Sequence, residues 1–101
     1  MSEIDLTWRV PIELPAFAGH FEGNPIVPGV VLLDQALIRA QALVANDDIL
    51  WQVTQAKFLS PVGPGELLQF ILEHTPRGRI RFEIVSGNRM VASGMFSPDK
   101  S

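Results

Sequence analysis

The chain has 101 residues and a formal net charge of −3 at pH 7. This length fits one domain, and the excess of acids argues against a nucleic-acid-binding protein, which would carry an excess of Lys and Arg. Hydrophobic residues make up 47% of the chain and charged residues 19%. A monomer of this size cannot readily bury so many hydrophobic residues in its own core. We therefore expect some of them to lie in a subunit interface.

The chain contains no cysteine, which excludes disulfides, thiolate catalysis and cysteine-based metal sites. Its N-terminus carries Glu3 and Asp5 and no apolar segment typical of a signal peptide. The most apolar stretch, residues 30–45, includes charged side chains and is too short to span a bilayer. We therefore expect a single domain over residues 1–101, located in the cytoplasm.

The pattern of the chain predicts one helix among about five strands. Residues 4–12 alternate apolar and polar side chains as a half-buried strand does, and residues 14–29 are rich in Gly and Pro, as loops are. Residues 30–45 contain neither and predict a helix. Further strands are expected over residues 50–59, 66–75, 79–85 and 89–96. A mostly antiparallel sheet packed on one helix is an α+β architecture.

The predicted helix places Asp34 among aliphatic side chains. At about 100° per residue, its neighbours on the helical wheel are Val30, Leu37 and Ile38. The side of the helix that can reach water carries Gln35, Arg39 and Asn46. A carboxyl group wrapped in aliphatic side chains is desolvated, which favours its protonated form. An equally good interpretation is that Asp34 only complements the dipole near the helix start.

The most informative segment is the loop of residues 19–29, Gly-His-Phe-Glu-Gly-Asn-Pro-Ile-Val-Pro-Gly. Its glycines and prolines restrict the backbone and place the His20 imidazole beside Phe21. Pro28 and Gly29 then begin the helix, where unpaired N–H groups suit a developing oxyanion. Together with Asp34, this set fits removal of a proton next to a carbonyl group. From these residues alone, a loop histidine without a catalytic role is the commoner situation.

This loop resembles the signature of the β-hydroxyacyl-acyl-carrier-protein dehydratases. That signature is Gly-His-Phe-Pro-Gly-x-Pro-x-x-Pro-Gly with an acid fourteen positions after the histidine, where Asp34 stands. Residues 56–68, Ala-Lys-Phe-Leu-Ser-Pro-Val-Gly-Pro-Gly-Glu-Leu-Leu, are similar to the family's Lys-Phe-x-x-Pro-Val-x-Pro-Gly-Asp-x-Leu. The resemblance implies a hotdog fold, an antiparallel sheet wrapped around one long central helix.

The resemblance also implies an activity, the cofactor-free dehydration of a 3-hydroxyacyl thioester on acyl carrier protein to the trans-2-enoyl thioester. His20 would remove the α-proton, and Asp34 would protonate the departing hydroxyl group. The Gly29 N–H would bind the thioester carbonyl, and the Ile26 carbonyl would hold the tautomer of His20. The neighbouring substrate-binding positions are Phe21 and Pro28.

In this family the histidine and the acid of one site come from different subunits. The resemblance therefore implies a homodimer or larger oligomer, or a heterodimer with a related subunit. Short relatives serve in fatty-acid or specialised pathways such as those for aryl polyenes.

Some positions depart from the family pattern. Glu22 replaces a proline, Gln35 stands where alanine is favoured, and Ile38 stands where glutamine is common. The chain is also shorter than most members. These departures leave two alternatives open: a hotdog thioesterase, and a non-catalytic partner subunit of a dehydratase complex.

Two further features have plain interpretations beside functional ones. His74 ends a predicted strand, a position typical of a surface histidine. Its spacing from His20 does not match that of metal ligands, so we expect no metal site. Four arginines fall within thirteen residues: Arg77, Arg79, Arg81 and Arg89. They form either a solvated strand face or a docking surface for an acidic carrier protein.

Overall fold

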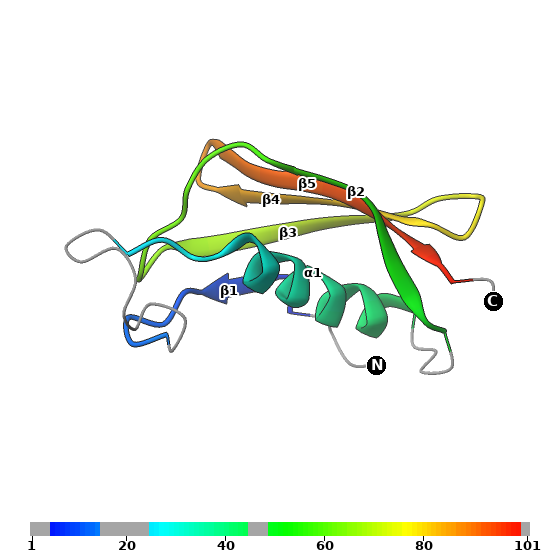
Figure 1. The fold of residues 1–101 in the computed structure, drawn as a ribbon, viewed down its shortest axis with the longest axis horizontal. Helices are drawn as coiled ribbons and strands as arrows, with labels where there is room; N and C mark the ends of the chain where they lie inside the picture. The colour runs from blue at the N-terminus through cyan, green and yellow to red at the C-terminus, as the bar shows by residue number, and fades with distance from the viewer. Residues whose placement is uncertain (1–4, 15–24, 45–48, 100–101) are drawn as a thin grey trace.

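The computed structural model describes residues 5–14, 25–44 and 49–99, which form one helix and five strands (Figure 1). The elements are β1 (Thr7–Arg9), α1 (Gly29–Val44), β2 (Trp51–Phe58), β3 (Leu67–His74), β4 (Ile80–Ser86) and β5 (Arg89–Pro98). All six elements predicted from the sequence pattern are present. The first strand is much shorter than the predicted segment 4–12, because only three of its residues pair with β3.

The five strands form one antiparallel sheet in the order β1-β3-β4-β5-β2. Consecutive strands β3, β4 and β5 are joined by tight turns that contain Gly78 and Gly87. Both glycines have a positive φ, 79° and 60°, a conformation that side chains with a Cβ rarely adopt. The strands β1 and β2 lie at the two edges of the sheet.

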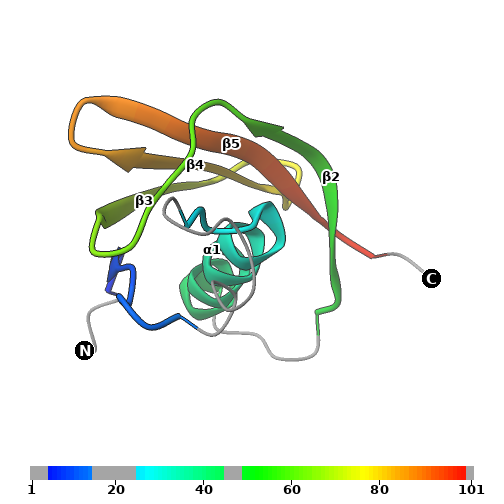
Figure 2. The ribbon, with the colours of Figure 1, turned by 60° about the vertical axis from the view of Figure 1, so that its left-hand side comes forward.

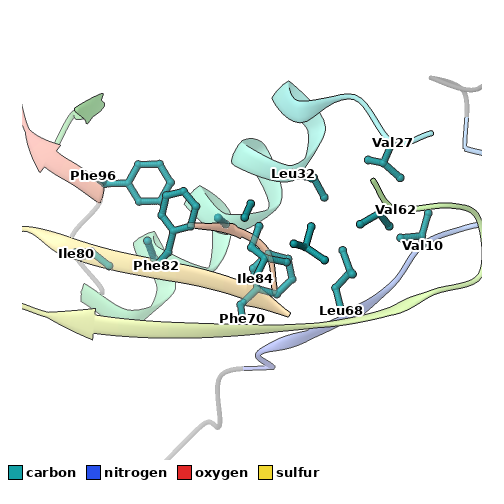
Figure 3. Close-up of a cluster of buried hydrophobic side chains, with 14 residues drawn as sticks. Val10, Val27, Leu32, Val62, Leu68, Phe70, Ile80, Phe82, Ile84 and Phe96 are labelled. Atoms are coloured by element: carbon teal, nitrogen blue, oxygen red, sulfur yellow. The ribbon is translucent and has the colours of Figure 1, made fainter. Parts of the chain in front are cut away.

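The sheet curls around α1, which lies along its concave face (Figure 2). The helix turns Leu32, Ala36 and Ala40 toward the sheet, and all three are buried. The small alanines let the helix approach the aromatic side chains of the strands. The core contains Phe70, Phe82 and Phe96 together with alternating aliphatic residues of β4 (Figure 3). The predicted α+β architecture, a sheet wrapped around one long helix, is confirmed.

In a single chain the sheet covers only one side of the helix. Asp34 is exposed, and its neighbours Val30 and Ile38 are 71% and 50% exposed. One curled sheet covers only one side of a helix, and no other described segment covers the opposite side. This strip of α1 is therefore an apolar surface with one carboxyl group in its middle.

The side of α1 that carries Gln35 and Arg39 does not face water as expected. Both residues are partly buried between α1 and the β1 edge of the sheet. The Arg39 guanidinium lies 4.5 Å from the ring centroid of Phe70 and donates a hydrogen bond of 2.9 Å to the Thr7 carbonyl. A long arginine stem can fill such a gap while its head bonds to backbone carbonyls. Asn46 lies outside the described residues.

Candidate active site

A cavity of about 410 Å³ lies where the first turn of α1 meets the end of β2. One wall comes from residues 26–32 and the other from residues 58–62. Its lining is mostly aliphatic and aromatic, with the Ser60 side chain as a polar exception. Such a lining suits the apolar part of a small ligand.

The start of α1 presents its backbone to this cavity. A Cβ built on Gly29 would lie 2.8 Å from the Cζ atom of Phe58, closer than real contacts allow, so the Phe58 ring would have to shift to admit a side chain here. The Pro28 carbonyl accepts the N–H groups of Val31 and Leu32 at 3.0 and 3.4 Å. Among the described residues none accepts a hydrogen bond from the Gly29 N–H. An amide in this position at a helix N-terminus can bind a carbonyl oxygen or an oxyanion.

The segment before α1 is fixed by one backbone hydrogen bond. The Val27 N–H donates to the Val62 carbonyl at 2.8 Å, and both side chains are buried. Ile26 is partly buried and lines the cavity beside Gly29, whereas Pro28 is partly buried between them. The structure therefore brings two of the predicted site residues, Ile26 and Gly29, into one wall of the cavity, and Pro28 links them along the chain without lining the cavity.

Asp34 does not belong to this wall. It lies five residues after Gly29, which turns it about 140° around the helix axis. Its side chain is exposed and does not line the cavity. The burial of Asp34 predicted from its aliphatic neighbours is absent in one chain, because the described residues leave that side of α1 uncovered.

His20 and Phe21 lie outside the described residues, as does Glu22. Within residues 5–14, 25–44 and 49–99, no group of three or more His, Asp or Glu side chains is arranged to hold a metal ion. Nor does the described part of the chain contain a helix of the length and apolarity needed to cross a membrane.

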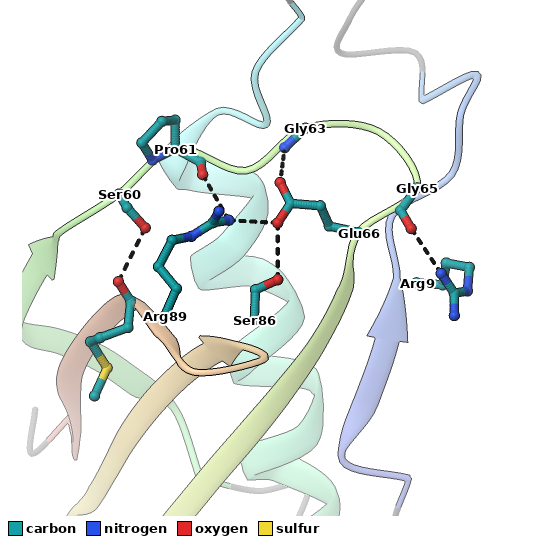
Figure 4. Close-up of polar contacts among 9 residues, drawn as sticks. Arg9, Ser60, Pro61, Gly63, Gly65, Glu66, Ser86 and Arg89 are labelled. Carbon is teal, nitrogen blue, oxygen red and sulfur yellow. Dashed lines mark hydrogen bonds and ion pairs between the residues drawn. The ribbon is translucent and has the colours of Figure 1, made fainter.

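A polar network beside the cavity was not predicted from the sequence (Figure 4). The Glu66 Oε2 atom accepts the Gly63 N–H at 2.7 Å. Its Oε1 atom accepts the Ser86 hydroxyl at 2.9 Å and the guanidinium of Arg89. Arg89 Nη2 also donates to the Pro61 carbonyl at 3.2 Å. The sequence indicates this network only through Glu66, the acid that follows Pro-Gly in the second motif. Its partner Arg89 is 23 residues further along the chain, so the motif does not reveal the pair.

The surroundings of Glu66 favour its ionised form. Partial burial by itself raises the pKa of this carboxyl group. Hydrogen bonds from the Gly63 N–H, the Ser86 hydroxyl and the Arg89 guanidinium outweigh that effect, and the pKa of Glu66 lies below its usual value of 4.5. Glu66 is thus a charged acceptor at neutral pH.

Comparison with known proteins identifies the family. Residues 1–95 match the ApeI-like family model, described as ApeI dehydratase. The chain belongs to the ApeI-like dehydratase family. It is also 35% identical over 102 residues to the 3-hydroxyacyl-(acyl-carrier-protein) dehydratase FabZ of Chlamydia trachomatis serovar L2. That match covers 88% of this chain and 67% of the enzyme.

Solved structures agree on the fold. A structure described as the dehydratase heterocomplex ApeI:P from Xenorhabdus doucetiae matches with a TM-score of 0.78 and 23% identity, over 93% of this chain and 84% of that chain. A probable thioesterase from Bartonella henselae matches with a TM-score of 0.62 and 14% identity, over 94% of each chain. The predictions of a hotdog fold and of a member of the 3-hydroxyacyl-acyl-carrier-protein dehydratase family, a class of carbon–oxygen lyases, are confirmed.

The four arginines of this ApeI-like chain do not form one surface. Arg89 begins β5 and bonds to Glu66, so it belongs to the network beside the cavity. Arg77 and Arg79 lie at the other end of β4, about 20 Å away along seven strand residues. Arg81 pairs with Glu73 at 3.5 Å. Arg77, Arg79 and Arg81 line one hollow of about 290 Å³, and the first two also line a second one of about 600 Å³. Of the four residues in the predicted docking surface, only Arg89 therefore lies apart from the others.

Proposed function

We propose that this chain dehydrates a 3-hydroxyacyl thioester carried on acyl carrier protein, releasing the trans-2-enoyl thioester and water. The observation that carries the proposal is the apolar cavity with the Gly29 amide in its wall, an amide that has no acceptor among the described residues. Membership of the ApeI-like dehydratase family and the substrate class in the name of the Chlamydia relative support it.

In the proposed reaction, His20 takes the proton from the carbon next to the thioester carbonyl. The electron pair of that C–H bond forms the new double bond, and the C–O bond at the β-carbon breaks. Asp34 gives a proton to the departing hydroxyl group, which leaves as water. Charge that builds on the thioester oxygen is stabilised by the Gly29 N–H, while the Ile26 carbonyl fixes the His20 tautomer. Atoms and electrons balance without a cofactor.

We propose that each site combines His20 of one subunit with Asp34 of another. In support, Asp34 lies on the side of α1 away from its own cavity, on the exposed apolar strip with Val30 and Ile38. The edge strand β2 exposes Val53 and Phe58 by 45% and 49%. A second subunit over these surfaces would bury apolar area and desolvate Asp34. The partner is a second copy or a related subunit, as in the heterocomplex named for the Xenorhabdus structure.

The carrier protein is proposed to dock at Arg77 and Arg79. Neither has an ion-pair partner among the described residues, and the hollow they line also holds the hydroxyl groups of Thr54 and Ser97. Asp99 also lines this hollow, so the two arginines leave it an excess of one positive charge, which suits an acidic carrier. The cytoplasmic location and the biosynthetic pathway stay predictions from the sequence.

One assay on the purified protein separates the proposal from its alternatives. A 3-hydroxyacyl thioester is supplied, enoyl thioester is followed by its absorbance, and free thiol is measured in parallel. Dehydration by wild type that is lost in His20→Ala supports the proposal. Release of thiol without enoyl product identifies a thioesterase, and neither product from a verified oligomer identifies a non-catalytic subunit. Either of these results overturns the proposed function.

A further inference from the structure

Two segments that are distant in the sequence, the β2–β3 loop and the β4–β5 turn, meet at the Glu66 carboxylate (Figure 4). Its hydrogen-bond donors come from Gly63 in the β2–β3 loop, Ser86 at the end of β4 and Arg89 at the start of β5. One side chain therefore ties the β2–β3 loop to the β4–β5 turn.

The tied loop is a wall of the cavity, to which it contributes residues 59–62. Arg89 holds this wall directly as well, through its hydrogen bond to the Pro61 carbonyl. The Ser60 hydroxyl adds a bond of 3.1 Å to the Met90 carbonyl. The Leu59 and Ser60 N–H groups donate to the Val91 carbonyl at 2.8 and 3.3 Å, so backbone and side-chain bonds together hold this wall on β5 and its turn.

This wall is connected to the opposite one by the bond from the Val27 N–H to the Val62 carbonyl. Val27 stands between Ile26 and Pro28, and Pro28 leads directly into Gly29. Because proline restricts its own φ and the conformation of the residue before it, the segment responds to a displacement as a stiff unit. A shift of Val62 therefore displaces the Ile26 carbonyl and the Gly29 amide.

We propose that Glu66 and Arg89 are positioning residues, which set the placement of the Ile26 carbonyl and the Gly29 N–H through the Val62–Val27 hydrogen bond. The kinetic part of this inference rests on the proposed function, whereas the mechanical link is a property of the fold. A displacement of about 1 Å at reacting groups can cost about 100-fold in rate. The Glu66–Arg89 pair can therefore control kcat although neither residue touches the reacting atoms.

The chain offers a matched control for a merely structural role. Glu73 and Arg81 also form a Glu–Arg pair, but on the outer face of β3 and β4, with side chains 66% and 58% exposed. Neither residue lines the cavity beside α1. A pair that only stabilises the fold changes the free energy of unfolding and leaves the kcat of the folded protein unchanged.

The test uses Glu66→Gln, Arg89→Met and Glu73→Gln in the full chain, with amide hydrogen exchange and kinetics on a small 3-hydroxyacyl thioester. At a temperature where circular dichroism shows each variant folded, we expect exchange of the Val27 amide to be faster by about tenfold in the first two variants only. We expect kcat to fall by about tenfold or more in the same two. The double variant Glu66→Gln/Arg89→Met should be no slower than the worse single variant, because the two residues act as a unit. Glu66→Asp, which keeps the charge, should recover part of kcat.

Unchanged exchange at Val27 in a folded Glu66→Gln protein overturns the mechanical link. Faster exchange with kcat within about twofold of wild type overturns the positioning role. If Glu66→Gln does not fold, Ser86→Ala removes one bond to the carboxylate, keeps the charge pair and is read in the same way. If wild type performs no dehydration, the proposed function fails, and the exchange result still decides the link between Glu66 and Val27.

Discussion

The ring of Phe58 lies against the backbone of Gly29, so closely that a Cβ there would come within 2.8 Å of Cζ. We expect Gly29→Ala to lower the free energy of unfolding, because overpacking costs about 1–3 kcal/mol and the gain in helix propensity is about 1 kcal/mol at most. Chemical denaturation measures the change.

The control is the same substitution in a Phe58→Leu background. There the clash is removed, and Gly29→Ala should be neutral or stabilising. An equal loss of stability in both backgrounds would show that the aromatic ring is not the reason for glycine at this position.

Arg39 joins α1 to the β1 edge of the sheet. Its guanidinium lies over Phe70 and donates to the carbonyls of Thr7 and Gln35. We expect Arg39→Ala to destabilise the fold by about 1–3 kcal/mol through lost packing and unpaired carbonyl groups. Arg39→Lys should recover only part of this, since an ammonium group cannot match the planar fork of donors. Urea denaturation of both variants measures these changes. A free energy of unfolding equal to that of wild type in both would contradict this role.

The lowered pKa of Glu66 predicts a pH dependence of stability. Its pKa is lower in the folded chain than in the unfolded chain, so its ionised form favours folding. The contribution is fully present above the unfolded value, near 4.5, and is lost as pH falls through the folded pKa. The difference in unfolding free energy between wild type and Glu66→Gln should therefore be larger at pH 7 than at pH 3. The exposed control Glu73→Gln should show a small difference at both.

Hydrophobic periodicity was sufficient to predict the helix and the strands, because α1 and β4 each bury one regular set of side chains. The helical wheel also grouped Asp34 with Val30 and Ile38 correctly. It gave relative positions only, and so could not show that the sheet covers the opposite side or that Arg39 turns inward. The pairing of Glu66 with Arg89 depends on the register of β3 on β4 and of β4 on β5, which a local pattern does not contain.

Charge reversal at Arg77 and Arg79 tests the docking proposal. We expect Arg77→Glu/Arg79→Glu to raise KM for carrier-bound substrate and to leave kcat/KM for a small thioester unchanged, because the hollow lies at the end of β4 far from the cavity. The rise should shrink at high salt, where exposed charges are screened. Equal effects on both substrates would show that these arginines act on the site itself.

The proposed sharing of each site between two subunits gives the strongest prediction for this family member. His20→Ala and Asp34→Asn should each be nearly inactive as homodimers, since each removes one proton-transfer group from every site. A heterodimer of the two variants then has one site with both lesions and one site with none. Random association yields half heterodimers, so the mixture should recover about a quarter of wild-type activity if the dimer is twofold symmetric.

Co-expression with two different tags gives a verified heterodimer without relying on subunit exchange. Purified in this way, it should have about half of wild-type activity, because one of its two sites is intact. If both side chains act within one chain instead, every site in every species keeps a lesion and no activity returns. An inactive heterodimer would overturn the placement of Asp34 in a neighbouring subunit's site, and the exposed apolar strip around Asp34 would then need a different partner.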